Sequence, residues 1–185
     1  MTRETNYKST YAACFIGYIT QAAVVNMPPL LFIIFSRQFG ISLDKISLLI
    51  TLNFATQMLV DLLSSKFLPL IGYRLCAVLA NVFSAGGLLL LGVLPLCMPP
   101  FGGLVVAFVL MAIGGGLMEV LVSPIIDAIP SDNKSARMSL LHSVYCWGAV
   151  GVIGSTTLMN FLLPEKLWYV IPIVWAVIPF VNTFL

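Results

Sequence analysis

The chain has 185 residues, of which 60% are hydrophobic and 9% are charged, and its formal net charge is +2. Soluble domains are roughly 45–50% apolar and about 25% charged, so a soluble fold of this composition would have an apolar exterior and would aggregate. A lipid bilayer accepts such an exterior. The small net charge, with no basic patch carrying interleaved aromatic residues, excludes a nucleic-acid-binding protein.

A membrane-spanning helix needs about 20 mostly apolar residues. Six segments of the chain meet this condition, Gly, Pro and charged residues fill the intervals between them, and no strand-like alternation competes. The polar residues 1–10 do not resemble a cleaved signal peptide. We therefore expect an all-α integral membrane protein with one transmembrane domain over residues 1–185, made of helices at about 11–35, 46–68, 74–96, 102–126, 136–163 and 167–185.

The second predicted helix carries a polar stripe. Asn53, Gln57 and Asp61 recur every four residues and therefore share one helix face. A polar stripe inside a membrane faces the interior of a helix bundle, since lipid does not hydrogen-bond. Asp61 lies towards one end of this helix, where it could pair with Lys66 or Arg137 as a gate or a structural brace, and we favour the brace.

The fourth predicted helix contains the carboxyl group Glu119, which follows Gly114–Gly116 and has only apolar neighbours. An ionisable group at a helix centre costs roughly 2.5–3.5 kcal/mol on insertion scales and normally faces a cavity or a partner. An apolar environment disfavours the charged carboxylate, so Glu119 is a candidate to take and release a proton. The alternative is a protonated carboxyl that forms a hydrogen bond between helices.

The fifth predicted helix places His142, Tyr145 and Cys146 on one face, at spacings of three and four residues. One His and one Cys are too few for a zinc site, and the chain lacks the common metalloprotease, nucleotide-binding and hydrolase motifs. We expect neither a metal, a cofactor nor an enzymatic activity. The face either lines a cavity for a solute or forms a hydrogen bond between helices.

Small residues and prolines mark the places where helices pack closely or bend. The glycines of the fourth and fifth helices could serve packing or a hinge: Gly114–Gly116, Gly148, Gly151 and Gly154. The prolines expected to bend or break helices are Pro28, Pro29, Pro124, Pro172 and Pro179.

Four cysteines lie in apolar runs and are expected to be buried free thiols: Cys14, Cys76, Cys97 and Cys146.

Basic residues predict the orientation of the helices. Six of the nine lie on the side that both termini share: Arg3, Lys8, Lys66, Arg74, Lys134 and Arg137. The other side has Arg37, Lys45 and Lys166. The excess of positive charge predicts cytoplasmic termini. The last residues carry neither charge nor a polar cap, and we expect the chain to stop at or near the end of a sixth helix.

The sequence from Gly114 through Glu119 to Pro124, followed by residues 137–148 with His142 and Tyr145, resembles the fucose permease branch of the major facilitator superfamily. That branch has a G-x-G-x-x-E-x4-P pattern and then L-N-L-x-H/Q-x-x-Y/N-x-x-G at similar spacing. The end of the second helix, residues 61–74, resembles the same branch. The resemblance covers the whole chain as six helices, which is half of a usual twelve-helix transporter.

The resemblance implies a proton-coupled carrier, such as a sugar symporter of the bacterial inner membrane. Glu119 would contribute to substrate binding and proton coupling, and His142 and Tyr145 would contact the solute. Asn53, Gln57, Asp61 and Arg74 would be gating or structural polar residues. The chain also departs from the family, because Pro29 occupies the position of a helix 1 aspartate.

The leading hypothesis is therefore the N-terminal half of a secondary transporter that moves a small polar solute across the plasma membrane by proton-coupled alternating access. Its partners would be the solute, protons, the bilayer and a second six-helix half. A first alternative is a half-length transporter that works as a homodimer. A second, of another class, is a membrane scaffold or subunit that transports nothing.

Overall fold

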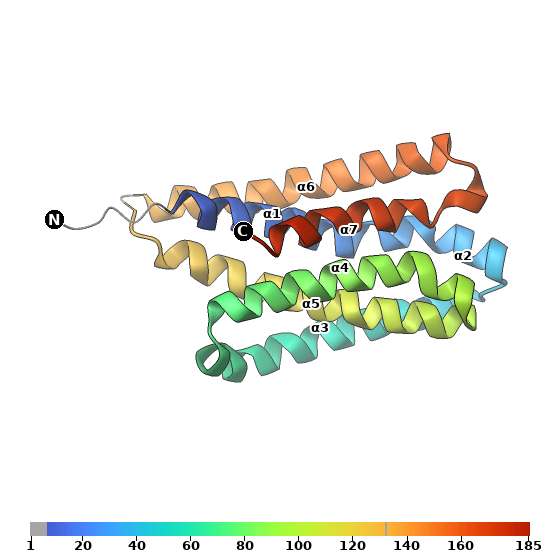
Figure 1. Ribbon diagram of the computed structural model, residues 1–185, viewed down its shortest axis with the longest axis horizontal. Coiled ribbons are helices and arrows are strands. Elements are labelled where there is room, and N and C mark those ends of the chain that lie inside the picture. The colour runs from blue at the N-terminus through green and yellow to red at the C-terminus, as the bar shows by residue number, and fades with distance from the viewer. Residues whose placement is uncertain (1–6, 132) are drawn as a thin grey trace.

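The computed structural model describes residues 7–131 and 133–185, and these residues form helices and short connections with no strand. The helices run roughly along the long axis of the molecule and alternate in direction (Figure 1). In chain order they are α1 (Lys8–Asn26), α2 (Phe32–Phe39), α3 (Leu43–Ile71), α4 (Tyr73–Cys97), α5 (Pro100–Ala128), α6 (Lys134–Leu162) and α7 (Val170–Asn182). Short 3-10 turns at Pro28–Leu31 and Glu165–Leu167 precede α2 and α7.

Five segments of the described chain are long and apolar enough to cross a membrane. They are Lys8–Phe39, which joins α1 to α2, Leu43–Ser64 of α3, Tyr73–Cys97, Pro100–Ala128 and Lys134–Leu162. Each corresponds to one of the first five predicted helices. This agrees with the expected all-α, multi-pass membrane protein.

The sixth predicted segment, residues 167–185, forms a shorter helix than the sequence indicates. α7 has 13 residues, whereas a span needs about 20. The difference arises because the chain first makes a 3-10 turn at Glu165–Leu167, and the α-helix begins only at Val170. Six membrane-spanning helices therefore stay a prediction.

Proline interrupts the first span but leaves the other helices continuous. Pro28–Leu31 forms a 3-10 turn between α1 and α2, as expected of two adjacent prolines. Pro124 and Pro179, in contrast, remain inside α5 and α7. Pro69, which was expected in a loop, lies inside α3, and that helix ends at Gly72, whose φ of 87° favours glycine. Membrane helices tolerate proline because neighbouring groups satisfy the freed carbonyls.

α5 lies at the centre of the bundle, where three consecutive glycines, Gly114–Gly116, let it contact three other helices. A β-carbon on Gly114 would lie 2.6 Å from the backbone nitrogen of Ser84 in α4. β-carbons on the next two glycines would lie 3.1 Å from Val24 of α1 and from Val60 of α3, respectively. The glycine run therefore serves close helix packing, one of the two roles expected of it.

α6 lies at an edge of the bundle and packs mainly against α1 (Figure 1). A β-carbon on Gly148 would lie 3.5 Å from Ala22 and from Ile19, which is ordinary contact. Gly151 and Gly154 are exposed, with open space where a side chain would extend. α3, at the opposite edge, is equally uncovered, because only 11% of each of these two spans is buried.

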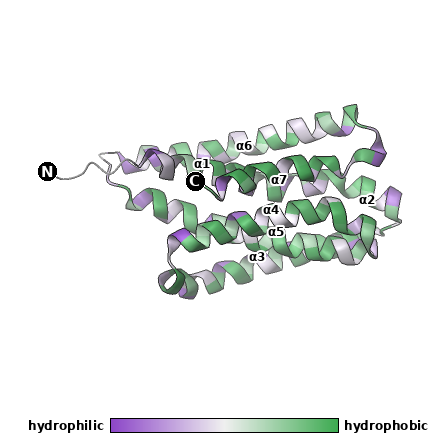
Figure 2. Cartoon of the chain, viewed as in Figure 1, coloured by the Kyte–Doolittle hydropathy of each residue, from purple (hydrophilic) through white to green (hydrophobic). Residues whose placement is uncertain are grey.

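The N-terminal end of α1, the α3–α4 turn and the α5–α6 connection lie at one end of the bundle (Figure 1). Hydrophilic residues gather at this end, while the middle of the helices is mostly hydrophobic (Figure 2). Five of the six basic residues assigned to this side are described: Lys8, Lys66, Arg74, Lys134 and Arg137. Arg3, the sixth, lies outside the described residues. Which side of a membrane this end faces stays a prediction.

Candidate functional site

A polar pocket of about 620 Å³ opens between α1, α3, α5 and α6. The floor comes from α1 and α5, which pack against each other, and the sides come from α3 and α6. The pocket brings together five of the residues singled out in the sequence. Its lining is Tyr18, Gln21, Val25, Phe54, Gln57, Met58, Asp61, Glu119, His142 and Tyr145.

Glu119 is the centre of the hydrogen bonding in this pocket. The side-chain amide of Gln57 on α3 donates to Glu119 Oε2 at 2.7 Å, and that of Gln21 on α1 donates to the same oxygen at 3.0 Å. The Glu119 carboxyl group therefore connects α5 by hydrogen bonds to both α1 and α3. Although Glu119 has apolar neighbours along the chain, its side chain is exposed on the open side of the pocket.

Asp61 lies beside Glu119, against the third glycine of α5. The position of a β-carbon on Gly116 would be 3.4 Å from Asp61 Oδ1, and Glu119 follows Gly116 by three residues, on the same helix face. Asp61 Oδ1 is buried and has no hydrogen-bond partner. Asp61 forms no ion pair with Lys66 or Arg137 in the described structure and lines the pocket, so its expected role as a gate or a brace stays a prediction.

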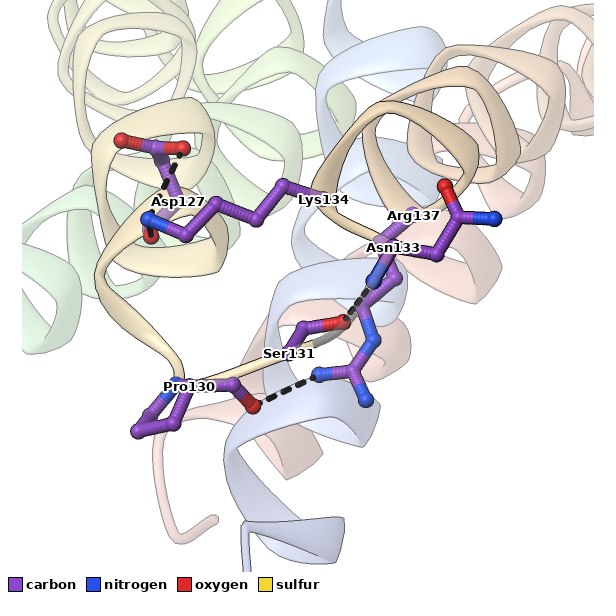
Figure 3. A network of polar contacts seen from close by, with 6 residues as sticks. All are labelled: Asp127, Pro130, Ser131, Asn133, Lys134 and Arg137. Atoms are coloured by element: carbon purple, nitrogen blue, oxygen red, sulfur yellow. Dashed lines mark hydrogen bonds and ion pairs between the residues drawn. The ribbon is translucent and has the colours of Figure 1, made fainter.

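Arg137 takes part in a separate network at the α5–α6 connection, where Figure 3 shows it with its neighbours. Its guanidinium donates to the carbonyl of Pro130 at 3.4 Å and lies 4.9 Å from the centre of the Tyr11 ring. In the same network, Lys134 Nζ lies 3.6 Å from Asp127 Oδ1 and donates to the Asp127 carbonyl at 2.7 Å. These contacts engage both Lys134 and Arg137 at the α5–α6 connection.

His142 and Tyr145 reach the pocket from α6 and meet an aromatic residue of α1. The Tyr18 ring centre lies 6.0 Å from that of His142 and 5.9 Å from that of Tyr145, the latter in an edge-to-face arrangement. Tyr18 is held by a 3.0 Å hydrogen bond between its hydroxyl and Ser123 Oγ. Cys146, expected on the same face, is exposed and does not line the pocket.

Sequence reasoning missed the contribution of α1 to this site. Gln21 and Tyr18 are both buried, and neither was singled out. A signal was present, because Gln21 is one of only two amide side chains in a mostly apolar helix, the other being Asn26, and Tyr18 precedes it by three residues. Applying the polar-stripe rule used for Gln57 and Asp61 to this helix would have found both.

Two predicted polar residues lie outside the pocket. Asn53 lines a small adjoining cavity of about 50 Å³ that also contains Pro29 and shares Phe54 with the main pocket. Arg74 lines another cavity, of about 430 Å³, near the start of α4. Residues of α1, α5 and α7, such as Asn182, also line it. The gating roles expected for Asn53 and Arg74 therefore stay predictions.

The cysteines divide into two groups, of which one corrects the expectation that all four are buried. Cys14 and Cys76 are buried, whereas Cys97 and Cys146 are exposed, and all four are free. In the part of the chain that the structure describes, no three His, Cys, Asp or Glu side chains gather closely enough to hold a metal ion.

Comparison with protein-family models, with curated proteins and with solved structures finds no match for this chain, so the site is interpreted from its own residues.

Proposed function

We propose that this chain is the N-terminal six-helix half of a major facilitator transporter, which moves a small polar solute, such as a sugar, across the plasma membrane with proton coupling. One observation carries the proposal. A pocket with two carboxyl groups, Asp61 and Glu119, opens on one side of a bundle whose helices are apolar enough to span a membrane.

Both carboxyl groups lie far from the helix ends. Asp61 and Glu119 are each more than about two turns from either end of α3 and α5. Polar side chains at that depth face a bundle interior or a water-filled cavity, since exposure to lipid is costly. In a membrane, another protein segment must therefore cover the open side of the pocket, so that lipid is excluded and a solute can still enter.

The cover in this proposal is a second six-helix half that contacts the uncovered sides of α3 and α6. Both helices expose large apolar residues: Phe54 and Met58 on α3, which line the pocket, and Trp147 on α6. A site between two halves, near the middle of the membrane, is the arrangement that alternating access requires. In the homodimeric alternative, a second copy of this chain supplies the same cover.

Glu119 is the proton-exchanging group in this mechanism. As a carboxylate it accepts hydrogen bonds from both Gln21 and Gln57 on one oxygen, Oε2. Protonation turns one carboxyl oxygen into a donor and reduces its capacity as an acceptor. Because Gln21 lies on α1 and Gln57 on α3, protonation would change the contacts between three helices as access alternates.

Orientation follows from the basic residues. Most of them gather at the end of the bundle that holds the α3–α4 and α5–α6 connections, which favours a cytoplasmic position for that end and for both termini.

Proton uptake driven by a solute gradient tests the proposal in proteoliposomes of the full-length protein, screened over sugars and other small polar solutes. We expect Glu119→Gln to abolish coupled uptake, since the amide cannot exchange a proton. Asp127→Asn is the matched control on the same helix, because Asp127 lies at the exposed α5–α6 connection, and it should leave uptake intact. Coupled uptake that survives Glu119→Gln contradicts the mechanism. No uptake of any solute favours the membrane-scaffold alternative.

A further inference from the structure

The charge of the pocket lining is one-sided. Two carboxyl groups, Asp61 and Glu119, line the pocket, and none of the lysines and arginines that the structure describes does so. The basic residues nearest in sequence, Lys66 on α3 and Lys134 and Arg137 on α6, lie towards the end of the bundle, and the latter two are engaged in the α5–α6 network (Figure 3). The walls that this chain supplies therefore carry two carboxyl groups against one histidine, His142, and no lysine or arginine among the described residues.

Two carboxyl oxygens in the pocket, Asp61 Oδ1 and Glu119 Oε1, receive no hydrogen bond from the described residues. Asp61 Oδ1 is buried and unpartnered, in the space that the missing side chain of Gly116 provides. The amide donors of Gln21 and Gln57 both go to a single oxygen of Glu119, and its Oε1 receives no hydrogen bond in the described structure. A ligand that satisfies these oxygens must bring donors of its own.

The rest of the lining is aromatic and apolar. Tyr18 and Tyr145 form an edge-to-face pair, and the hydrogen bond to Ser123 holds the Tyr18 ring in place. Phe54 and Met58 of α3 line the pocket as well. Aromatic faces attract cations through their ring electrons, and such surfaces bind the apolar body of a ligand.

A neutral sugar fits this lining poorly. A sugar presents many hydroxyl groups that need both donors and acceptors, yet each glutamine amide already gives one of its two N–H groups to Glu119, so the lining offers more carboxylate acceptors than free donors of this kind. It would also leave the charge of the carboxylates uncompensated once the proposed second half covers the site and excludes water, which is costly.

Building on the proposed transport function, we propose that the solute is an organic cation: an amine whose ammonium group binds Asp61 and Glu119 while its aromatic or aliphatic body lies against Tyr18, Tyr145, Phe54 and Met58. Four features of one pocket agree on this ligand chemistry: its carboxyl groups, its unpartnered acceptors, its aromatic rings and a described lining without lysine or arginine.

A charge series of one molecular shape tests the proposal by titration calorimetry with the full-length protein in detergent. The probes are phenethylamine, which is cationic at neutral pH, neutral 2-phenylethanol and anionic phenylacetate, with L-fucose as a neutral polyhydroxyl solute. Because a charge-assisted hydrogen bond contributes about 1.5–3 kcal/mol, we expect phenethylamine to bind at least about tenfold more tightly than 2-phenylethanol, and phenylacetate to bind least.

Variants assign the effect to the pocket. Asp61→Asn and Glu119→Gln should each weaken phenethylamine binding by about tenfold or more and bring it close to that of 2-phenylethanol. Asp127→Asn, which removes a carboxylate of α5 outside the pocket, should leave phenethylamine binding unchanged.

Three results overturn the cation proposal: equal binding of phenethylamine and 2-phenylethanol, binding of L-fucose or phenylacetate in preference to phenethylamine, or no binding of phenethylamine. Each of them leaves the transport function to the separate test of proton-linked uptake, so the two proposals can fail independently. Proton-linked uptake of L-fucose alone, for example, would sustain transport and reject an organic cation as the solute.

Discussion

Helices α5 and α6 are both 29 residues long and each carries a group of three glycines in its middle, Gly114–Gly116 in α5 and Gly148, Gly151 and Gly154 in α6, yet they are packed in opposite ways. In α5, 56% of the most apolar 18-residue stretch is buried, and each glycine of Gly114–Gly116 lies against a different helix. In α6, only 11% is buried, and Gly151 and Gly154 meet open space. Composition alone therefore does not tell which helix is central.

The spacing of the glycines explains part of this difference. Three consecutive glycines occupy three directions around a helix, about 100° apart, so they thin the helix on several sides at once. Gly148, Gly151 and Gly154 recur every three residues and so lie closer to one side. A helix of the first kind suits the centre of a bundle, and one of the second kind suits a single close contact at an edge.

Replacing one glycine by alanine in each helix should give the largest difference in the free energy of unfolding. Gly114→Ala places a β-carbon 2.6 Å from Ser84 N and 2.8 Å from the Ala80 carbonyl, so α4 and α5 must separate. We expect a loss of about 2 kcal/mol in the free energy of unfolding. Gly151→Ala meets no neighbour and should gain about 0.5 kcal/mol from helix propensity. Unfolding in detergent by SDS titration measures both. Equal effects of the two variants would contradict the packing difference.

Thiol labelling tests the same contrast without altering the packing. In single-cysteine variants, Cys146 of α6 should react quickly with a membrane-permeable maleimide, whereas Cys14 of α1 should react only after unfolding, because it is 5% exposed. Cys97, at the exposed end of α4, serves as a positive control, and Cys76 serves as a second buried one. Rapid labelling of Cys14 in the folded protein would show that the bundle is looser than described.

The sequence predicted the helices of this fold better than their arrangement. Long apolar runs show where a chain can span a membrane, because that condition depends on local composition. The late start of α7 and the continuation of α3 through Pro69 were not predictable in this way. They depend on the turn at Glu165–Leu167 and on Gly72, whose effects on neighbouring residues are not visible in a hydropathy pattern.

The candidate site was predicted in part for a similar reason. Glu119, His142 and Asp61 stand out because ionisable residues are rare inside membranes, and they do line one pocket. The partners of these residues could not be read from the sequence, since they depend on which helices are neighbours. Asp61 illustrates this, because a loop base seemed its nearest partner, whereas the α3–α5 contact at Gly116 places it beside Glu119.

A smaller effect should come from the contact between α6 and α7. Trp175 Nε1 donates to Thr156 Oγ1 at 3.1 Å, and Thr156 is fully buried. Thr156→Val keeps the shape and removes the acceptor, so we expect a loss of about 1 kcal/mol in the free energy of unfolding. Thr157→Val is the matched control, since Thr157 is exposed. If the two variants are equally stable, this hydrogen bond does not help to hold α6.

The smallest effect should come from the ion pair that connects the end of α5 to the start of α6. Both side chains are more than half exposed at this pair of Lys134 and Asp127, and exposed ion pairs contribute about 0–1 kcal/mol. Asp127→Asn should therefore cost less than about 0.5 kcal/mol in the free energy of unfolding, and the cost should fall further at high salt, which screens exposed charges.

Lys134→Ala separates the ion pair from the helix-capping contact at the same place. Lys134 also donates to the Asp127 carbonyl at 2.7 Å, in the last turn of α5, where a cation is favourable because of the helix dipole. Lys134→Ala should thus cost more than Asp127→Asn in the same SDS titration. Equal losses would show that the side-chain pair carries the whole contact. In either case the α5–α6 loop contributes little to the free energy of unfolding. The attachment of α6 therefore depends on its packing against α1 and on what covers the face with Gly151 and Gly154.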